Sequence, residues 1–169
     1  EAVIEAANDA SREHPMRVIV LESYDPDASA LLNAEIRVGG DAGASEVIVL
    51  RAYGAAGHDR ESLLTGLLLP DAPVVAWWPE NPPERPSRSP SGRMAQRRIT
   101  DASTNPVGPD RLNNLASAYA PGDTDLAWTR LTHWREQLAA VLDQPPYEPV
   151  TRVEVVGSGS SPSTGLLAA

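Results

Sequence analysis

Short apolar runs, bounded by prolines and polar clusters, predict the β-strands of a buried sheet. Residues 16–21 (Met-Arg-Val-Ile-Val-Leu) and 46–53 (Glu-Val-Ile-Val-Leu-Arg-Ala-Tyr) are rich in β-branched side chains. Residues 74–78 (Val-Val-Ala-Trp-Trp) lie between two prolines and show no polar alternation. Such runs are typical of strands that are covered on both faces. We therefore expect the three runs to be neighbouring strands of one sheet, with helices packed on it.

Alternating polar and apolar residues predict further strands with one solvent-facing side. Residues 34–38 (Ala-Glu-Ile-Arg-Val) alternate in this way, and the glycine-rich loop 39–43 connects them to the run that begins at Glu46. A strand pair joined by such a loop is expected to form an antiparallel hairpin. Residues 96–102 predict a short strand, and residues 150–156 alternate again and predict another.

Apolar residues at helical spacing predict the helices. Residues 1–13 form an amphipathic pattern, Asp59 is placed to cap a leucine-rich helix, and residues 109–119 predict a third helix. The longest helix is expected from about residue 124 to residue 142, with Asp123 or Thr124 as its cap.

The longest predicted helix carries a stripe of apolar residues that step by four or three positions. These residues are Ala127, Leu131, Trp134, Leu138 and Val141. Because such a stripe normally faces a protein core, we expect Trp134 to be buried with Leu131 and Leu138.

The order of these elements indicates an α/β protein. We expect a mixed, mostly buried open sheet with flanking helices, followed by a helical segment and the start of a further strand–helix unit. The domains are expected to be an α/β core with a helical extension over residues 1–145, and a connector with the start of a second domain over residues 146–169. The first helix begins without a cap, and the helix expected from Ser163 is not completed, so we expect the protein to continue at both ends.

Composition narrows the function classes. The net charge of -9 argues against a general nucleic-acid binder, which needs a basic face. No apolar segment is long enough to cross a bilayer, so the expected location is the cytoplasm. The chain has no cysteine and no lysine, which excludes thiolate catalysis, Schiff-base chemistry and a P-loop lysine.

No catalytic, cofactor-binding or metal-binding set emerges from the motifs. The glycines of residues 39–43 lack the spacing of a phosphate loop, so a turn is the better interpretation. Asp123 and Asp125 with His133 can be drawn as an acid–base set, but two acids at a helix start are more simply capping residues. The histidines do not have the spacing of metal ligands.

Four residues are candidates for binding a partner. Arg93, Arg97 and Arg98 form the dense basic cluster of this acidic chain, and Trp78 stands beside the proline-rich loop 79–92. Tryptophan and arginine are enriched at protein interfaces. The alternative for the arginines is a solvated face, and the alternative for Trp78 is the core.

Five stretches of the sequence, taken together and in this order, carry a family resemblance. They are residues 14–20 (His-Pro-Met-Arg-Val-Ile-Val), 36–46 (Ile-Arg-Val-Gly-Gly-Asp-Ala-Gly-Ala-Ser-Glu), 68–79 (Leu-Leu-Pro-Asp-Ala-Pro-Val-Val-Ala-Trp-Trp-Pro), 96–102 (Gln-Arg-Arg-Ile-Thr-Asp-Ala) and 119–135, which begins Tyr-Ala-Pro-Gly-Asp-Thr-Asp and contains Trp134-Arg135. They closely resemble the glucose-6-phosphate dehydrogenase assembly protein family, called OpcA, of actinobacteria and cyanobacteria.

The resemblance implies a non-catalytic protein that binds glucose-6-phosphate dehydrogenase, promotes its assembly or activation and so supports the oxidative pentose phosphate pathway. It implies no cofactor and no catalytic residue. The rival interpretation is a small-molecule-binding α/β domain, for a sugar phosphate or a nucleotide, or an enzyme, that works at the carboxyl edge of the sheet near Trp77.

Overall fold

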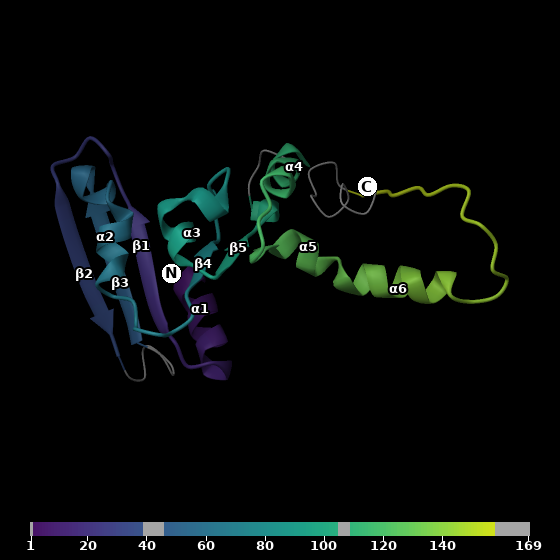
Figure 1. Cartoon of the computed structure of the whole chain (residues 1–169), viewed down its shortest axis with the longest axis horizontal. Helices are drawn as coiled ribbons and strands as arrows, with labels where there is room; N and C mark the ends of the chain where they lie inside the picture. The colour runs from purple at the N-terminus through teal and green to yellow at the C-terminus, as the bar shows by residue number, and fades with distance from the viewer. Residues whose placement is uncertain (1, 39–45, 105–108, 158–169) are drawn as a thin grey trace. The chain divides into compact units, whose positions relative to one another are not determined.

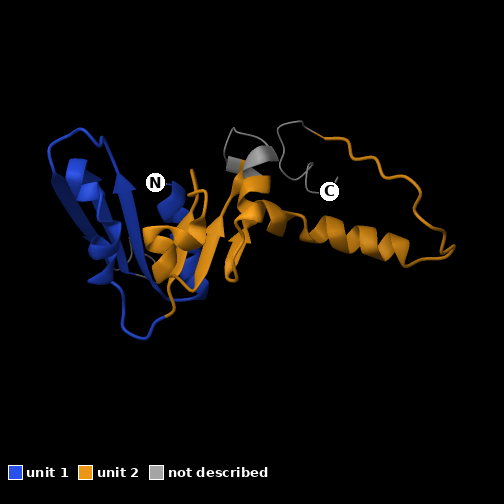
Figure 2. Cartoon of the chain, turned by 45° about the horizontal axis from the view of Figure 1, so that its top comes forward, with its two compact units in different colours: residues 1–72 blue, residues 73–169 orange. Residues whose placement is uncertain are grey.

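The computed structural model describes residues 2–38, 46–104 and 109–157. The chain divides into two compact units, residues 1–72 and residues 73–169 (Figures 1 and 2). Both units contain helices as well as a sheet, so the α/β class expected from the sequence is confirmed. The prediction of one single sheet is wrong. The described strands form two separate three-stranded sheets, and the run that contains Trp77 and Trp78 belongs to the second.

The sheet of the first unit is mixed. It consists of β1 (Arg17–Ser23), β2 (Leu31–Arg37) and β3 (Glu46–Tyr53), in the order β1-β3-β2. β3 is parallel to β1 and antiparallel to β2, which confirms the expected hairpin. The continuous apolar run of β3 explains its central place, because a central strand is covered on both faces.

Helices flank the strands of this first unit. In α1 (Ala2–Glu13), Ile4 packs with Val47 and Val49 of β3 in a small buried cluster. A 3₁₀ helix, η2 (Gly54–Gly57), follows β3 and leads to α2 (Arg60–Thr65). As expected, Asp59 caps α2: its carboxylate accepts a hydrogen bond from the backbone N–H of Ser62 at 3.1 Å.

The sheet of the second unit is parallel throughout. Its strands are β4 (Val75–Trp78), β5 (Arg97–Thr100) and β6 (Asp123–Asp125), in that order. The sequence predicted the first two. The third falls on residues that were expected to cap a helix, because its three polar residues lack the signature of a buried strand.

The connections between these strands contain short helices. The proline-rich segment forms η3 (Pro86–Arg88) and α3 (Pro90–Met94), while η4 (Ala102–Thr104) and α4 (Pro109–Ser117) lie between β5 and β6. Ala102, Leu115 and Ala127 form the buried apolar cluster of this unit. The segment expected to be a plain surface loop is therefore partly helical.

The long helix expected over residues 124–142 is divided. It consists of α5 (Leu126–Arg130) and α6 (Thr132–Leu142), with Leu131 between them. The strand expected over residues 150–156 is wrong, because those residues are described without regular structure. The glycine loop at residues 39–43 and the helix expected from Ser163 lie outside the described residues. The domain boundary expected near residue 145 stays a prediction.

Candidate functional site

The carboxyl ends of the parallel strands β4, β5 and β6 lie at one edge of the second sheet. Trp78 is paired with Thr100, and Thr100 with Asp125, so these three residues form a row at that edge. Open α/β sheets commonly bind ligands there, which makes the edge the first place to look for chemistry. Two carboxylates, those of Asp125 and Asp101, lie at this edge.

The carboxylate of Asp125 stabilises local structure. It caps α5 by accepting the N–H of Ala127 at 2.9 Å, and it also accepts the hydroxyl of Thr100 at 2.6 Å. The backbone N–H of Ala102 donates to the same carboxylate at 3.1 Å. The capping role expected for Asp125 is confirmed, and its oxygens are engaged in holding β5, β6 and α5 together.

Asp101, one residue past β5, is paired with Arg130 of α5. Two parallel hydrogen bonds of 2.9 and 2.6 Å connect the guanidinium to the two carboxylate oxygens. Hydrogen bonds from Arg130, and to a lesser extent from Ser103, together lower the pKa of Asp101 from 3.8 to about 2, against the opposing effect of burial. Asp101 is therefore a charged structural group at neutral pH, and a general base would need a higher pKa.

The histidine of the candidate acid–base set, His133, lies on α6 and not on a strand of this edge. His133 is exposed on α6, where its ring contacts Glu136 at 3.4 Å. Asp123 begins β6 and therefore does not cap a helix, and its carboxylate pairs with Arg98. Within residues 2–38, 46–104 and 109–157, the structure brings together no group of acidic residues and histidines that can hold a metal ion.

Arg98 is buried, whereas the sequence suggested that its side chain is exposed to solvent. Its side chain lies inside the turn before β6, where it pairs with Asp123 and donates to the carbonyls of Ala95 at 2.8 Å and Pro121 at 2.5 Å. Gly122 permits this close approach: its φ is +94°, and a Cβ there would lie 3.0 Å from the guanidinium. Arg98 thus connects β5 to β6.

The other predicted partner-binding residues are not gathered into one patch. Trp78 is half-buried at the carboxyl end of β4, whereas Arg97 is exposed at the start of β5, beside Val75. Arg93 is exposed on α3 and donates to the carbonyl of Arg88 at 3.1 Å. The register therefore separates Trp78 from Arg97 by the length of the strand, about 10 Å.

An exposed apolar face lies on α6. Trp134, Leu138 and Val141 share this face at helical spacing and are 61%, 49% and 69% exposed, so the expected burial of Trp134 and Leu138 is wrong. Leu131, which precedes α6, is 1% exposed and is the point where the stripe leaves the core. Just before it, Trp128 is also exposed, and the guanidinium of Arg135 lies 4.5 Å from its ring centre. We call Trp134, Leu138 and Val141 the α6 face.

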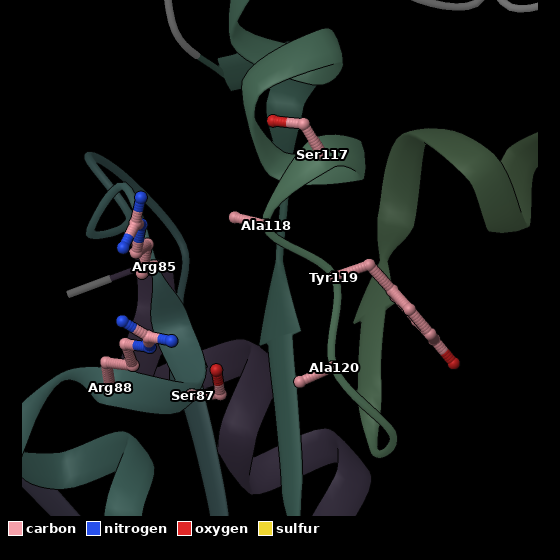
Figure 3. A pocket seen from close by; sticks show the side chains of 7 residues that line it. All are labelled: Arg85, Ser87, Arg88, Ser117, Ala118, Tyr119 and Ala120. Atoms are coloured by element: carbon pink, nitrogen blue, oxygen red, sulfur yellow. The ribbon is translucent and has the colours of Figure 1, made fainter.

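A polar pocket lies elsewhere in the second unit. It has a volume of about 360 Å³. Its lining comes from η3 with the residue before it and from the end of α4 with the turn after it, and Figure 3 shows these residues as Arg85, Ser87, Arg88, Ser117, Ala118, Tyr119 and Ala120. This pocket was not predictable from the sequence, because its two sides lie about thirty residues apart and carry no shared motif.

Comparison with protein families gives two adjoining matches. Residues 7–117 match a family model of the glucose-6-phosphate dehydrogenase subunit N-terminal domain, from the OpcA assembly family. Residues 121–169 match the model of the C-terminal domain of the same subunit. A search of the curated proteins found no match. Within the part of the chain that the structure describes, no helix is long and apolar enough to cross a membrane.

Proposed function

The chain belongs to the OpcA family of glucose-6-phosphate dehydrogenase assembly proteins, and from this membership we propose that it binds glucose-6-phosphate dehydrogenase and promotes its assembly or activation without catalysing a reaction. Its effect on metabolism is then to support the oxidative pentose phosphate pathway through that enzyme. The cytoplasmic location expected from the sequence stays a prediction.

The α6 face is the observation that carries this proposal. Trp134, Leu138 and Val141 expose apolar surface in a row along one side of a helix. Leaving such surface in water is unfavourable, by about 25 cal/mol for each Å² of apolar area. An amphipathic helix with an exposed apolar face commonly binds a groove of a partner protein. Because the family is described as an assembly family of glucose-6-phosphate dehydrogenase, we take this enzyme as the partner that covers the α6 face.

Charged and aromatic groups beside the α6 face suit the same role. Arg135 lies over the ring of Trp128, so that a cation and an exposed aromatic ring form a cation–π pair close in sequence to the residues of the α6 face. Trp and Arg are the residue types that most often dominate binding energy at interfaces.

Trp78, Arg93 and Arg97 remain separate candidates for contacting the same partner, because the structure does not gather them into one patch. The two arginines are exposed and Trp78 is half-buried. Arg98 is not expected to contact the partner directly, because its guanidinium is used inside the unit to connect β5 and β6.

The chemistry of the sheet edge supports a non-catalytic role. Asp101 and Asp125 are engaged by an arginine, a cap and backbone N–H groups. Such carboxylates stabilise structure, and neither is placed as a free acid or base beside a histidine. Binding is therefore the activity that this unit supports.

The test is a titration of purified glucose-6-phosphate dehydrogenase with this chain, in which both affinity and dehydrogenase activity are measured. We expect Trp134→Ala and Val141→Ala to remain folded by circular dichroism but to bind more weakly, with a loss of about 2 kcal/mol for the tryptophan, as is typical of an interface anchor. Ile36→Ala is the matched control, because Ile36 is an equally exposed apolar residue of the first unit.

The outcomes separate the surface from the function. If the α6 variants bind like the parent while Trp78→Ala or Arg97→Ala weakens binding, the dehydrogenase contacts the chain at that residue and not at the α6 face. If the Ile36→Ala control loses as much affinity as the α6 variants, the effect is not specific to α6. A parent chain that neither binds nor activates the dehydrogenase overturns the proposed function.

A further inference from the structure

We propose that the pocket between η3 and the end of α4 is a binding site for the phosphate group of a small hydroxylated phosphate monoester. We call it the arginine pocket, and its polar residues are Arg85, Ser87, Arg88 and Ser117. This proposal goes beyond the proposed function and does not depend on the α6 face.

Two arginines without a described acidic partner line the arginine pocket. Arg85 and Arg88 are exposed, whereas the buried Arg98 and the half-exposed Arg130 each pair with a carboxylate. The guanidinium groups of Arg85 and Arg88 make no hydrogen bond or ion pair within the described part of the structure, and the residues that line the pocket include no acid. In a chain with a net charge of -9, two unneutralised cations beside one cavity favour an anion.

The two arginines stand on a fixed backbone. Pro86, between them, is buried, and its carbonyl accepts the hydroxyl of Ser89 at 2.8 Å. The same hydroxyl accepts the N–H of Gly92 at 3.1 Å, and a Cβ on Gly92 would lie only 1.8 Å from the Pro86 carbonyl oxygen. η3 and α3 are thus held tightly together, so little conformational entropy is lost in the backbone when the arginines bind a ligand.

The geometry favours a phosphate over a single carboxylate. Figure 3 shows Arg85 and Arg88 on one side of the pocket with Ala118 and Ala120 opposite, while the Tyr119 side chain is directed away from the arginines. The small side chains opposite leave room for a group between the two sides. Two guanidinium groups match the double negative charge and several oxygens of a phosphate monoester, whereas a carboxylate offers one charge and two oxygens.

Ser87 and Ser117 can form hydrogen bonds with a ligand that carries a hydroxyl group as well as a phosphate. The hydroxyl of Ser117 already donates to the carbonyl of Asn114 at 2.8 Å, so its remaining capacity is to accept a hydrogen bond. A ligand hydroxyl supplies such a donor, while Ser87 on the arginine side can donate to a phosphate oxygen. The volume of about 360 Å³ is at the small end of the range for small-molecule pockets.

Isothermal titration calorimetry at constant ionic strength tests the proposal, with inorganic phosphate, glycerol 3-phosphate and acetate as probes. We expect saturable binding of phosphate, tighter binding of glycerol 3-phosphate, and no comparable binding of acetate. Arg85→Gln and Arg88→Gln should each weaken phosphate binding about tenfold, as expected for the loss of a charge-assisted hydrogen bond. Ser117→Ala should remove the preference for glycerol 3-phosphate over phosphate.

Arg60→Gln is the matched control, because Arg60 is an exposed arginine of the first unit. It should bind phosphate like the parent. The proposal is overturned if phosphate gives no saturable binding up to about 10 mM, if acetate competes equally, or if all three arginine variants weaken binding alike. Equal affinity for phosphate and glycerol 3-phosphate overturns the role given to Ser117. Because the dehydrogenase is absent from this experiment, its result is independent of the proposed function.

Discussion

Asp101 and Arg130 form a two-pronged ion pair between residues that are 29 positions apart in the sequence, with N–O distances of 2.9 and 2.6 Å. Asp101 follows the central strand of the second sheet, and Arg130 ends α5. Asp101 is 4% exposed, whereas the Arg130 side chain is about half exposed. The pair therefore connects the sheet edge to the helix that leads to the α6 face.

This pair predicts a specific pH dependence. The pKa of Asp101 is lowered from 3.8 to about 2, so folding favours its charged form. Its contribution to stability is complete above pH 4 and is lost as the pH falls through 2. We expect Asp101→Asn to lower the free energy of unfolding at pH 7 by roughly 1–2 kcal/mol, a value reduced for the solvent around Arg130.

Urea unfolding followed by tryptophan fluorescence measures this effect, since all four tryptophans lie in the second unit. The difference between Asp101→Asn and the parent should shrink between pH 4 and pH 2, where the parent's Asp101 becomes protonated. Asp143→Asn, at an exposed position after α6, is the control and should show no such convergence. A difference that stays constant down to pH 2 would show that the ion pair does not stabilise the fold.

Substitution of the neighbouring arginines Arg97 and Arg98 should lower the free energy of unfolding by very different amounts. Arg98→Gln removes the partner of Asp123, which is itself largely buried, and breaking a buried pair in this way costs about 3–5 kcal/mol. Arg97→Gln changes an exposed side chain and should alter stability by no more than about 0.5 kcal/mol. Equilibrium urea unfolding of the two variants gives the comparison. Similar losses in both would mean that Arg98 is not the connection between β5 and β6.

Local patterns predicted much of the first unit. The continuous apolar run of β3 fixed its bounds at Glu46 and Tyr53, and its pairing with β2 followed from the alternation that precedes the glycine loop. The cap at Asp59 was equally visible, because a cap depends on residues three positions apart. These features depend on neighbours in the sequence, which the sequence displays directly.

Long-range features were not predictable in the same way. The period of a strand shows which faces are covered but not which strand is its neighbour, so β4 was assigned to the wrong sheet. Arg98 looked exposed because its partners, Asp123 and the carbonyl of Pro121, come more than twenty residues later. An apolar stripe on a helix has the same pattern whether it faces its own core or a partner protein, which is why Trp134 was expected to be buried.

Leu131 and Trp134, three residues apart on one stripe, give the clearest test of the α6 face. Leu131 is 1% exposed, so Leu131→Ala should lower the free energy of unfolding by about 2–5 kcal/mol, as a large-to-small change in a core does. Trp134 is 61% exposed, so Trp134→Ala should change it by less than about 1 kcal/mol in the isolated protein. Chemical unfolding followed by circular dichroism measures both, without depending on the tryptophan that is removed.

When the dehydrogenase is added at saturating concentration, the parent should gain stability through binding, and Trp134→Ala should gain less. A loss of 3 kcal/mol or more for Trp134→Ala without the dehydrogenase would mean that Trp134 is packed in solution, and the α6 face would then be part of this protein's own core.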